Sequence, residues 1–219
     1  MSQVGIAIET ADKKAFATAV DWPGWSRSGK TEETAIEALL AYAVRYAAVA
    51  ARAGEKLDAR AVEVRVVERA TGGGGTAFGV PSLVTDHDRR STTEREAKRL
   101  AGLVRAAWQT FDEIAASAPA ELRKGPRGGG RDTPGIVEHV LGAEHAYARE
   151  MGLKLPAPVP DDPATVERLR AVMLRTLAAP SDGSPLADRK WTVRYAAHRI
   201  AWHALDHAWE IEDRSEPAG

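Results

Sequence analysis

Two histidines near the end of the chain, His203 and His207, have the spacing of a metal-binding pair. An α-helix turns by about 100° per residue, so side chains four positions apart lie on one face, one turn from each other. Neutral imidazole is a good ligand for zinc, nickel, copper and iron. The pair can therefore be two ligands of one divalent ion, or two core histidines that are hydrogen-bonded to backbone or carboxylate groups.

The pair lies on an apolar face of its helix rather than on a solvated one. Ala196, Ile200 and Ile211 fall on the same side of a helical wheel as both histidines. Burying a polar group is costly unless the group has a partner. Two imidazoles on a core face therefore need polar partners, and a shared metal ion would be one such partner.

The best third ligand comes from an earlier helical segment. His139 lies at the edge of the apolar face of that segment, whereas His145 lies on its far side. Glu144 lies near the middle of the face, where a carboxylate must be paired, protonated or close to a cation. The face itself is formed by Ile136, Val140, Ala143 and Tyr147.

The remaining two histidines are not expected to join this site. His87 falls in a polar segment and is expected to be solvated. His198 lies on the opposite side of the last helix, in a second apolar stripe formed by Trp202, Leu205 and Trp209. Such a stripe predicts a packing surface, covered either by an N-terminal domain or by a second copy of the chain in a homodimer.

The composition excludes several classes of protein. The 219 residues carry a formal net charge of −1, which argues against a protein that coats nucleic acid. There is no cysteine, so thiolate nucleophiles, disulfides and cysteine-ligated zinc are excluded. No apolar run approaches the roughly 20 residues that cross a bilayer, and the first residues lack the layout of a signal peptide. We therefore expect a cytoplasmic protein without a membrane or nucleic-acid partner.

The elements that must position the candidate residues fall into two parts, so the predicted fold class is an α+β chain of two domains. Residues 1–70 are expected to form a β-β-α-β unit, with strands at 4–9, 15–20 and 62–66, a helix at 31–53 and a further short strand at 25–28. Residues 71–90 have the composition of a glycine-rich, flexible linker. Residues 91–219 are expected to form a four-helix bundle, with helices at 93–118, 133–152, 162–177 and 186–213.

Residues 24–31 match the phosphate-binding pattern G-x-x-x-x-G-K-T. The preceding strand, however, alternates polar and apolar residues, which suits a half-exposed antiparallel sheet rather than the buried parallel sheet that this motif needs. Pro23 interrupts the approach, and no later strand ends in a magnesium-binding aspartate. The match is therefore interpreted as a turn at Gly29 followed by a helix that Thr31 caps.

Two stretches of the bundle carry a family resemblance. The first contains Glu138-His139, Ala143-Glu144 and Tyr147, and the second is the run 199–214 with its histidine pair. Together they resemble the DinB-like superfamily of four-helix metal proteins, which hold a divalent metal with one histidine from the second helix and an H-x-x-x-H pair near the end. The resemblance implies that the ligands are His139, His203 and His207 and that the metal is zinc or nickel.

The same resemblance implies a chemistry. DinB-like proteins include transferases and isomerases that use low-molecular-weight thiols, and a metal lowers the pKa of a thiol that binds it. Because the chain has no cysteine, such a thiol must be external and would act on a small electrophile. The candidate catalytic residues are Arg199, for an anionic substrate, and three carboxylates that could hydrogen-bond the imidazoles, namely Glu144, Asp206 and Glu210.

A second resemblance covers the first 70 residues. The stretch Trp22-Pro23-Gly24-Trp25 and the run 28–38 are similar to the HicB-like fold, which occurs in antitoxins and as an accessory module. No DNA-binding helix-turn-helix is evident beside it, so it is expected to be an accessory or interaction domain. The resemblance leaves a second function open, a non-catalytic binding or regulatory protein whose bundle holds a structural metal.

Overall fold

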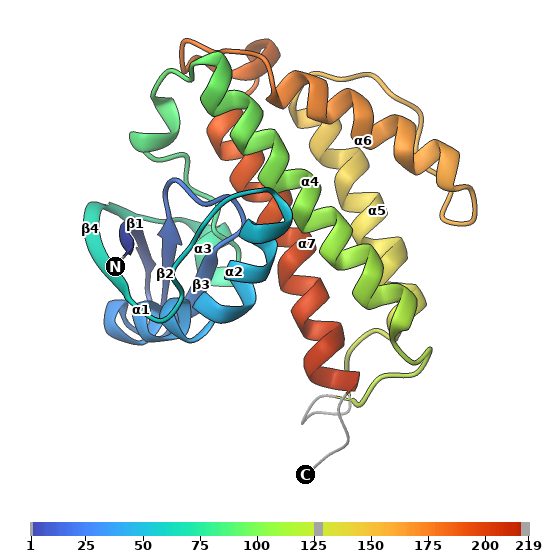
Figure 1. The fold of residues 1–219 in the computed structure, drawn as a ribbon, viewed down its shortest axis with the longest axis horizontal. Helices are drawn as coiled ribbons and strands as arrows, with labels where there is room; N and C mark the ends of the chain where they lie inside the picture. The colour runs from blue at the N-terminus through green and yellow to red at the C-terminus, as the bar shows by residue number, and fades with distance from the viewer. Residues whose placement is uncertain (1, 125–128, 216–219) are drawn as a thin grey trace.

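The computed structural model describes residues 2–124 and 129–215. Within these residues the chain is α+β, with a four-stranded mixed sheet and short helices on one side of the molecule and a group of longer helices on the other (Figure 1). The last helix, α7 (Val193–Ser215), runs between these two parts and packs against both. The histidine pair is therefore on the central helix of the fold.

The sheet has the strand order β3-β2-β1-β4. The central strand β1 (Ser2–Ala11) pairs antiparallel with β2 (Lys14–Ala19) and parallel with β4 (Val62–Thr71). The short strand β3 (Ser26–Gly29) pairs antiparallel with β2 at the edge. All four strands were expected from the sequence, and the structure extends β1 and β4 beyond the predicted limits.

The helix predicted over residues 31–53 is two helices. Helix α1 (Glu32–Ala41) and helix α2 (Ala43–Arg52) meet at Tyr42 with a bend of 53°. Thr31 caps α1, as expected, through a capping box with Thr34. No single helix among the described residues has the length and apolar composition of a membrane span, and only α1 and α2 taken together pass that test.

The stretch that matches the nucleotide-binding pattern is not a phosphate loop. Its residues Ser26–Gly29 form β3, whose partner β2 runs antiparallel to it. The backbone N–H groups of an edge strand do not converge on one point, as the cradle of a phosphate requires. The expected strand and the helix cap at Thr31 are therefore confirmed, whereas the turn expected at Gly29 is wrong, because Gly29 is the last residue of β3 and pairs with Ala15.

We expect no binding of ATP or GTP through residues 24–31. The measurement is calorimetry with the magnesium nucleotide, and Lys30→Ala is the matched variant. Micromolar binding that disappears in Lys30→Ala would contradict this description of the N-terminal part.

Four long helices follow the sheet. They are α4 (Glu94–Ser117), α5 (Thr133–Glu150), α6 (Pro163–Leu177) and α7. The sequence predicted the start of the last helix near residue 186, but it begins at Val193. The residues in between form a 3₁₀ turn, Leu186–Asp188, in which Ala187 and Asp188 have positive φ angles, a conformation that interrupts a right-handed helix.

The segment predicted as a flexible linker, 71–90, is packed against the sheet. It contains the short helix α3 (Gly74–Phe78), where the buried hydroxyl of Thr76 donates a hydrogen bond to the carboxylate of Glu9 on β1. A 3₁₀ turn, His87–Arg89, follows, and the carboxylate of Glu68 on β4 accepts hydrogen bonds from the backbone N–H groups of Asp86 and His87. The segment is therefore tied to the neighbouring strands β1 and β4 of the sheet.

The apolar stripe of α7 is covered by the N-terminal part of the chain. The ring of Trp202 meets Phe16 of β2 edge to face at 6.2 Å, and Trp209 meets Tyr42 at 5.1 Å. Gly24 lies over Leu205, and a Cβ at position 24 would come within 2.7 Å of the leucine side chain. The stripe is thus an internal packing surface that joins the sheet and the long helices into one core.

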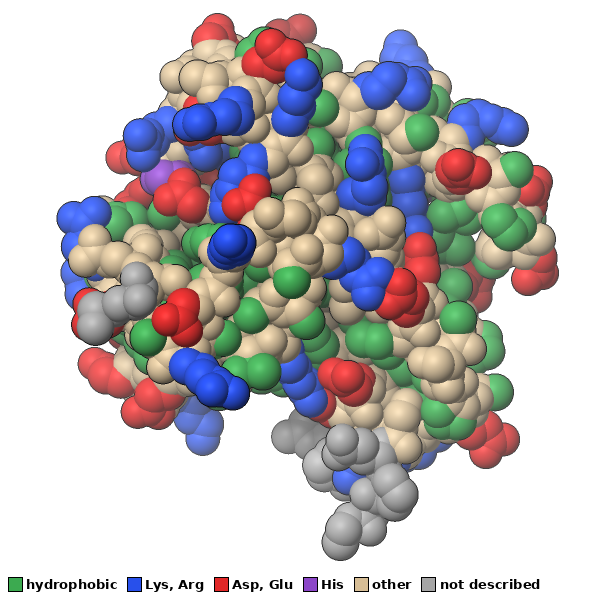
Figure 2. Space-filling view, in the orientation of Figure 1, with side chains coloured by type: hydrophobic (Ala, Val, Ile, Leu, Met, Phe, Trp, Pro, Cys, Tyr) green, Lys and Arg blue, Asp and Glu red, His purple; other side chains and the backbone are tan. Residues whose placement is uncertain are grey.

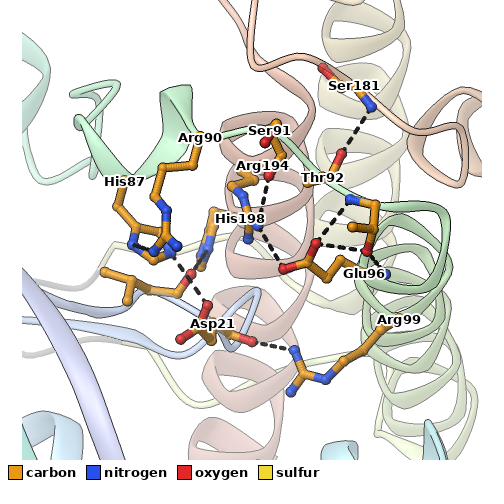
Figure 3. A network of polar contacts seen from close by, with 12 residues as sticks. Asp21, His87, Arg90, Ser91, Thr92, Glu96, Arg99, Ser181, Arg194 and His198 are labelled. Carbon is orange, nitrogen blue, oxygen red and sulfur yellow. Dashed lines mark hydrogen bonds and ion pairs between the residues drawn. The ribbon is translucent and has the colours of Figure 1, made fainter.

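Polar contacts reinforce this junction (Figure 3). The backbone carbonyl of Asp21 accepts a hydrogen bond of 2.6 Å from Arg99 of α4, and its carboxylate lies 3.3 Å from the ring of His87. His198 of α7 donates a hydrogen bond of 3.0 Å to the carbonyl of Val20. The expectation that His87 is solvated was wrong, because its side chain is only 10% exposed.

Candidate metal centre

Three histidines from two helices meet on one side of α7. His139 comes from α5, and His203 and His207 come from α7, as the helical spacing predicted. One ring nitrogen of each histidine lies within 4.8 Å of the other two, and the Nε2 atoms of His139 and His203 are 3.2 Å apart. The three residues that the sequence selected are therefore gathered at one point.

The spacing of these nitrogens fits a shared metal ion. Ligand nitrogens bind zinc at about 2.0–2.1 Å, so two of them lie about 3.4 Å apart around a tetrahedral ion and about 3.0 Å apart around an octahedral one. The 3.2 Å between His139 and His203 falls between these values. His207 brings its ring to 4.7 Å from the ring of His203 and 4.9 Å from that of His139, measured between centroids.

Burial keeps the imidazoles in the protonation state that binds metal. The pKa of His203 is lowered to about 2, chiefly because burial disfavours the charged ring and secondly because His207 and Arg199 repel a positive charge. Burial also lowers the pKa of His139. Neutral imidazoles with free lone pairs are the form that coordinates metals.

These pKa shifts predict that the metal-free protein loses stability on acidification. An unfolded histidine takes up a proton near pH 6.5, whereas folded His203 stays neutral, so stability falls as the pH drops below about 6.5. At pH 5 this residue alone costs about 2 kcal/mol. Urea unfolding of the chelator-treated protein at pH 7.5 and pH 5 should show a smaller decrease in His203→Gln, and an equal decrease in both proteins would contradict the burial of a neutral His203.

A carboxylate orients one of the three histidines. Glu210 accepts a hydrogen bond of 2.8 Å from Nδ1 of His207, which leaves the lone pair on Nε2. Arg214 in turn donates a hydrogen bond of 2.7 Å to Glu210. The pKa of Glu210 is lowered, first by its hydrogen bond with His207, so the group is a carboxylate. A carboxylate that holds the second nitrogen of a ligating histidine is a common feature of metal sites.

The other two candidate carboxylates face away from the histidines, so the sequence-based assignment was wrong for both. Glu144 is 2% exposed and makes two hydrogen bonds of 2.9 Å with Arg170 of α6. Asp206 pairs with Arg27 of β3. The sequence predicted that a carboxylate at position 144 must be paired, protonated or close to a cation. Glu144 is paired, but its partner is the guanidinium of Arg170 on α6 and not an imidazole.

Arg199 lies beside the site without an ionic partner among the described residues. Its guanidinium is 5.3 Å from the ring centroid of Tyr147 and 4.8 Å from that of Trp202. Its Nη1 is buried and has no hydrogen-bond partner in this part of the chain. Tyr147 meets His203 edge to face at 5.6 Å. A cation with free donors thus lies one aromatic ring away from the histidine cluster.

His145 is excluded from the site by geometry. Its Nε2 lies 2.9 Å from the carbonyl of Leu155, in the segment that leads to α6. The sequence placed it on the far side of its helix, and the structure agrees. It therefore provides a matched control for His139 on the same helix.

The pair of Glu144 and Arg170 holds α5 to α6. Arg170→Met leaves a buried carboxylate without its cation, and we expect a loss of about 3–5 kcal/mol in the free energy of unfolding. The double variant Glu144→Met with Arg170→Met should recover much of that loss, because both charges are removed. Arg168→Met, at an exposed position of α6, is the control in denaturant unfolding. A single variant as stable as the control would contradict the role of this ion pair.

Two residues that the sequence analysis did not single out are Arg170, the partner of Glu144, and Trp191, a neighbour of the histidine cluster. Arg170 carries no local signal, because only the packing of α6 against α5 brings it to Glu144. Trp191 precedes α7 and places its ring 5.2 Å from that of Tyr147, so it helps to enclose the site. The position of this tryptophan, just before the helix that carries the histidine pair, was the only feature of the sequence that pointed to a place near the site.

Comparisons with known proteins do not extend this description. No protein-family model, no curated protein and no solved structure matches the chain. The assignment of a function therefore rests on the geometry of the histidine cluster and on the residues around it.

Proposed function

We propose that the chain is a metal-dependent enzyme in which His139, His203 and His207 hold one divalent ion, with zinc or nickel as the leading candidates. The observation that carries the proposal is the convergence of three ring nitrogens within 4.8 Å, two of them 3.2 Å apart. The lowered pKa values of His139 and His203 support it, because both rings are then ready to coordinate.

The number and exposure of the ligands favour a catalytic site over a closed structural one. Structural zinc sites have four protein ligands, whereas catalytic sites have three and keep a position for water or substrate. Glu144 and Asp206 are committed to arginines and do not complete the ligand set. His139 and His207 are only partly buried, so a small molecule can approach the cluster from solvent.

The reaction we propose is a transfer or isomerisation that uses an external low-molecular-weight thiol and a small electrophile. An ion at the three histidines would lower the pKa of a thiol that contacts it and so supply a nucleophile. Glu210 would fix the ring of His207, and Arg199 would bind a carboxylate of the electrophile with its free donors. The chain itself has no cysteine that could take the place of the thiol.

The proposal includes the two family assignments suggested by the sequence. A DinB-like bundle is supported by four long helices with the histidines on the second and the fourth. A HicB-like module is supported by the β-β-β-α-α-β order before α3 and by the capped helix that follows β3. We propose an accessory role for this module, since its apolar face is occupied by α7.

The proposal is tested with protein purified without an affinity tag and loaded with zinc or nickel. It is incubated with a series of small thiols and either an α,β-unsaturated carboxylate or its neutral ester, and the loss of thiol is followed. We expect turnover that needs both metal and thiol and is abolished in His203→Ala. Arg199→Gln should raise KM for the carboxylate but not for the ester. A metal-loaded protein that turns over no thiol would instead favour the non-catalytic alternative with a structural metal.

A further inference from the structure

A second candidate binding site lies on the opposite side of α5 from the histidine cluster. It is a groove of about 980 Å³ between α4 and α6, with α5 at its base. Pockets that bind small molecules in proteins have volumes of about 300–1,000 Å³. Figure 2 shows this hollow between α4 and α6, with apolar side chains inside it and Lys or Arg side chains beside it.

The floor of the groove is apolar. The indole of Trp108 is almost fully buried beneath it. Arg170 crosses one part of the floor, with its guanidinium 5.1 Å from the Trp108 ring centroid and its charge balanced by Glu144 and Asp112. The remaining floor is formed by Ala101, Phe111, Val137, Leu141 and Leu174. A ligand that fills this floor must have an apolar body.

Two free arginines stand on opposite walls of the groove. Arg105 on α4 and Arg175 on α6 are exposed, and neither has an ion pair or side-chain hydrogen bond with any described residue. Helices α4 and α6 run antiparallel (Figure 1), so both arginines lie on the same side of the Arg170–Asp112 ion pair. Guanidinium groups bind carboxylates and related anions through paired hydrogen bonds.

The carboxylates of the groove do not cancel this charge. Asp112 is paired with Arg170 at 2.6 Å. Glu167, the other carboxylate in the lining, lies about two turns before Arg175 on α6, towards the opposite end of the groove. The groove therefore has a cationic end and an apolar floor.

A glycine on α4 supports this interpretation independently. Gly102 lines the groove in the interior of a helix, where glycine costs about 0.5–1 kcal/mol relative to alanine. No neighbour requires it, since a Cβ at this position would meet no atom within 4 Å. Because Gly102 has no side chain, the groove stays open near its cationic end, where Arg105 and Arg175 lie.

We propose that the groove between α4 and α6 binds an amphipathic anion, with an acyl or aryl body on the apolar floor and a carboxylate held by Arg105 and Arg175. This site shares no residue with the histidine cluster, so it stands or falls separately from the proposed enzyme activity.

The test uses the full-length, tag-free protein with 8-anilinonaphthalene-1-sulfonate as a fluorescent probe and decanoate as the competitor. We expect saturable binding of one probe per chain and displacement by decanoate, but at least about tenfold weaker displacement by uncharged decanol, because decanol lacks the charge-assisted hydrogen bonds. The double variant Arg105→Gln with Arg175→Gln should weaken the binding of decanoate by a similar factor. Gly102→Leu should block the binding of decanoate, because the leucine side chain fills part of the groove.

Two controls make each outcome decisive. Arg168→Gln, on the exposed side of α6, and His203→Ala, in the other site, should bind decanoate like the wild type. The proposal is overturned if decanoate shows no saturable competition at millimolar concentration, if decanol competes equally well, or if either groove variant binds like the wild type while its circular dichroism spectrum is unchanged.

Discussion

Replacing His203 with alanine is expected to reduce metal content from one divalent ion per chain to the background level. His203 is 7% exposed, and its Nε2 lies 3.2 Å from Nε2 of His139, so its loss removes the most buried of the three candidate ligands. A site with two histidines left binds far more weakly, because each ligand contributes to an affinity that also depends on preorganised geometry. Elemental analysis of tag-free protein after dialysis gives the result directly.

The companion variants define the site. His139→Ala and His207→Ala should also lose the metal, whereas His145→Ala, whose ring contacts the carbonyl of Leu155, should keep it. Glu210→Gln should retain the ion with reduced affinity, of the order of 10–100-fold, because it loses only the orienting carboxylate. Wild-type metal content in both His203→Ala and His207→Ala would rule out the site. Retention in His139→Ala alone would show that the third ligand is another residue.

The isolated long helices, residues 91–219, are expected to self-associate or aggregate. Without the sheet, Trp202, Leu205 and Trp209 of the α7 stripe lose their cover, although they are 6%, 0% and 2% exposed in the intact chain. Burial of a large apolar side chain contributes about 1.5–3 kcal/mol, so uncovering three of them costs roughly 5–9 kcal/mol. That loss is comparable to the whole stability of a typical domain.

Light scattering of the fragment and of the full chain at equal concentration measures this effect. The full chain should be monodisperse and unfold in one transition, because the two parts share a core. The point variant Phe16→Ala in the full chain should also increase self-association, to a smaller extent than in the fragment, because it removes one contact of Trp202. A stable, monomeric, metal-loaded fragment would show that the stripe needs no cover.

Local periodicity was enough to find the histidine pair and the strands. The i, i+4 spacing of His203 and His207 depends only on helix geometry, and the alternating pattern of β4 is visible in its sequence. The choice of His139 over His145 also followed from one helical wheel, since the two differ in the face they occupy. The structure places these residues where the patterns predicted, because each inference concerns a single element.

Contacts between distant segments were beyond such reasoning. Glu144 was wrongly assigned to the imidazoles, because its actual partner is Arg170 of α6. The packing of α6 against α5 brings the two residues together, and the sequence does not reveal that packing. The glycine run after residue 71 has the composition of a linker, yet Thr76 is buried against Glu9, 67 positions earlier. The cover of the α7 stripe was left open between the N-terminal part and a second copy, and only the structure places Phe16 and Tyr42 on it.

The most direct test of the proposed metal site is a titration of the chelator-treated, tag-free protein with cobalt(II), which substitutes for zinc and reports its ligands by visible absorption. The proposed site predicts a spectrum of nitrogen-coordinated cobalt that saturates at one equivalent per chain, is displaced by zinc and is absent in His203→Ala. A titration without a saturating visible band, or one that is unchanged in His203→Ala, would contradict a metal centre at His139, His203 and His207.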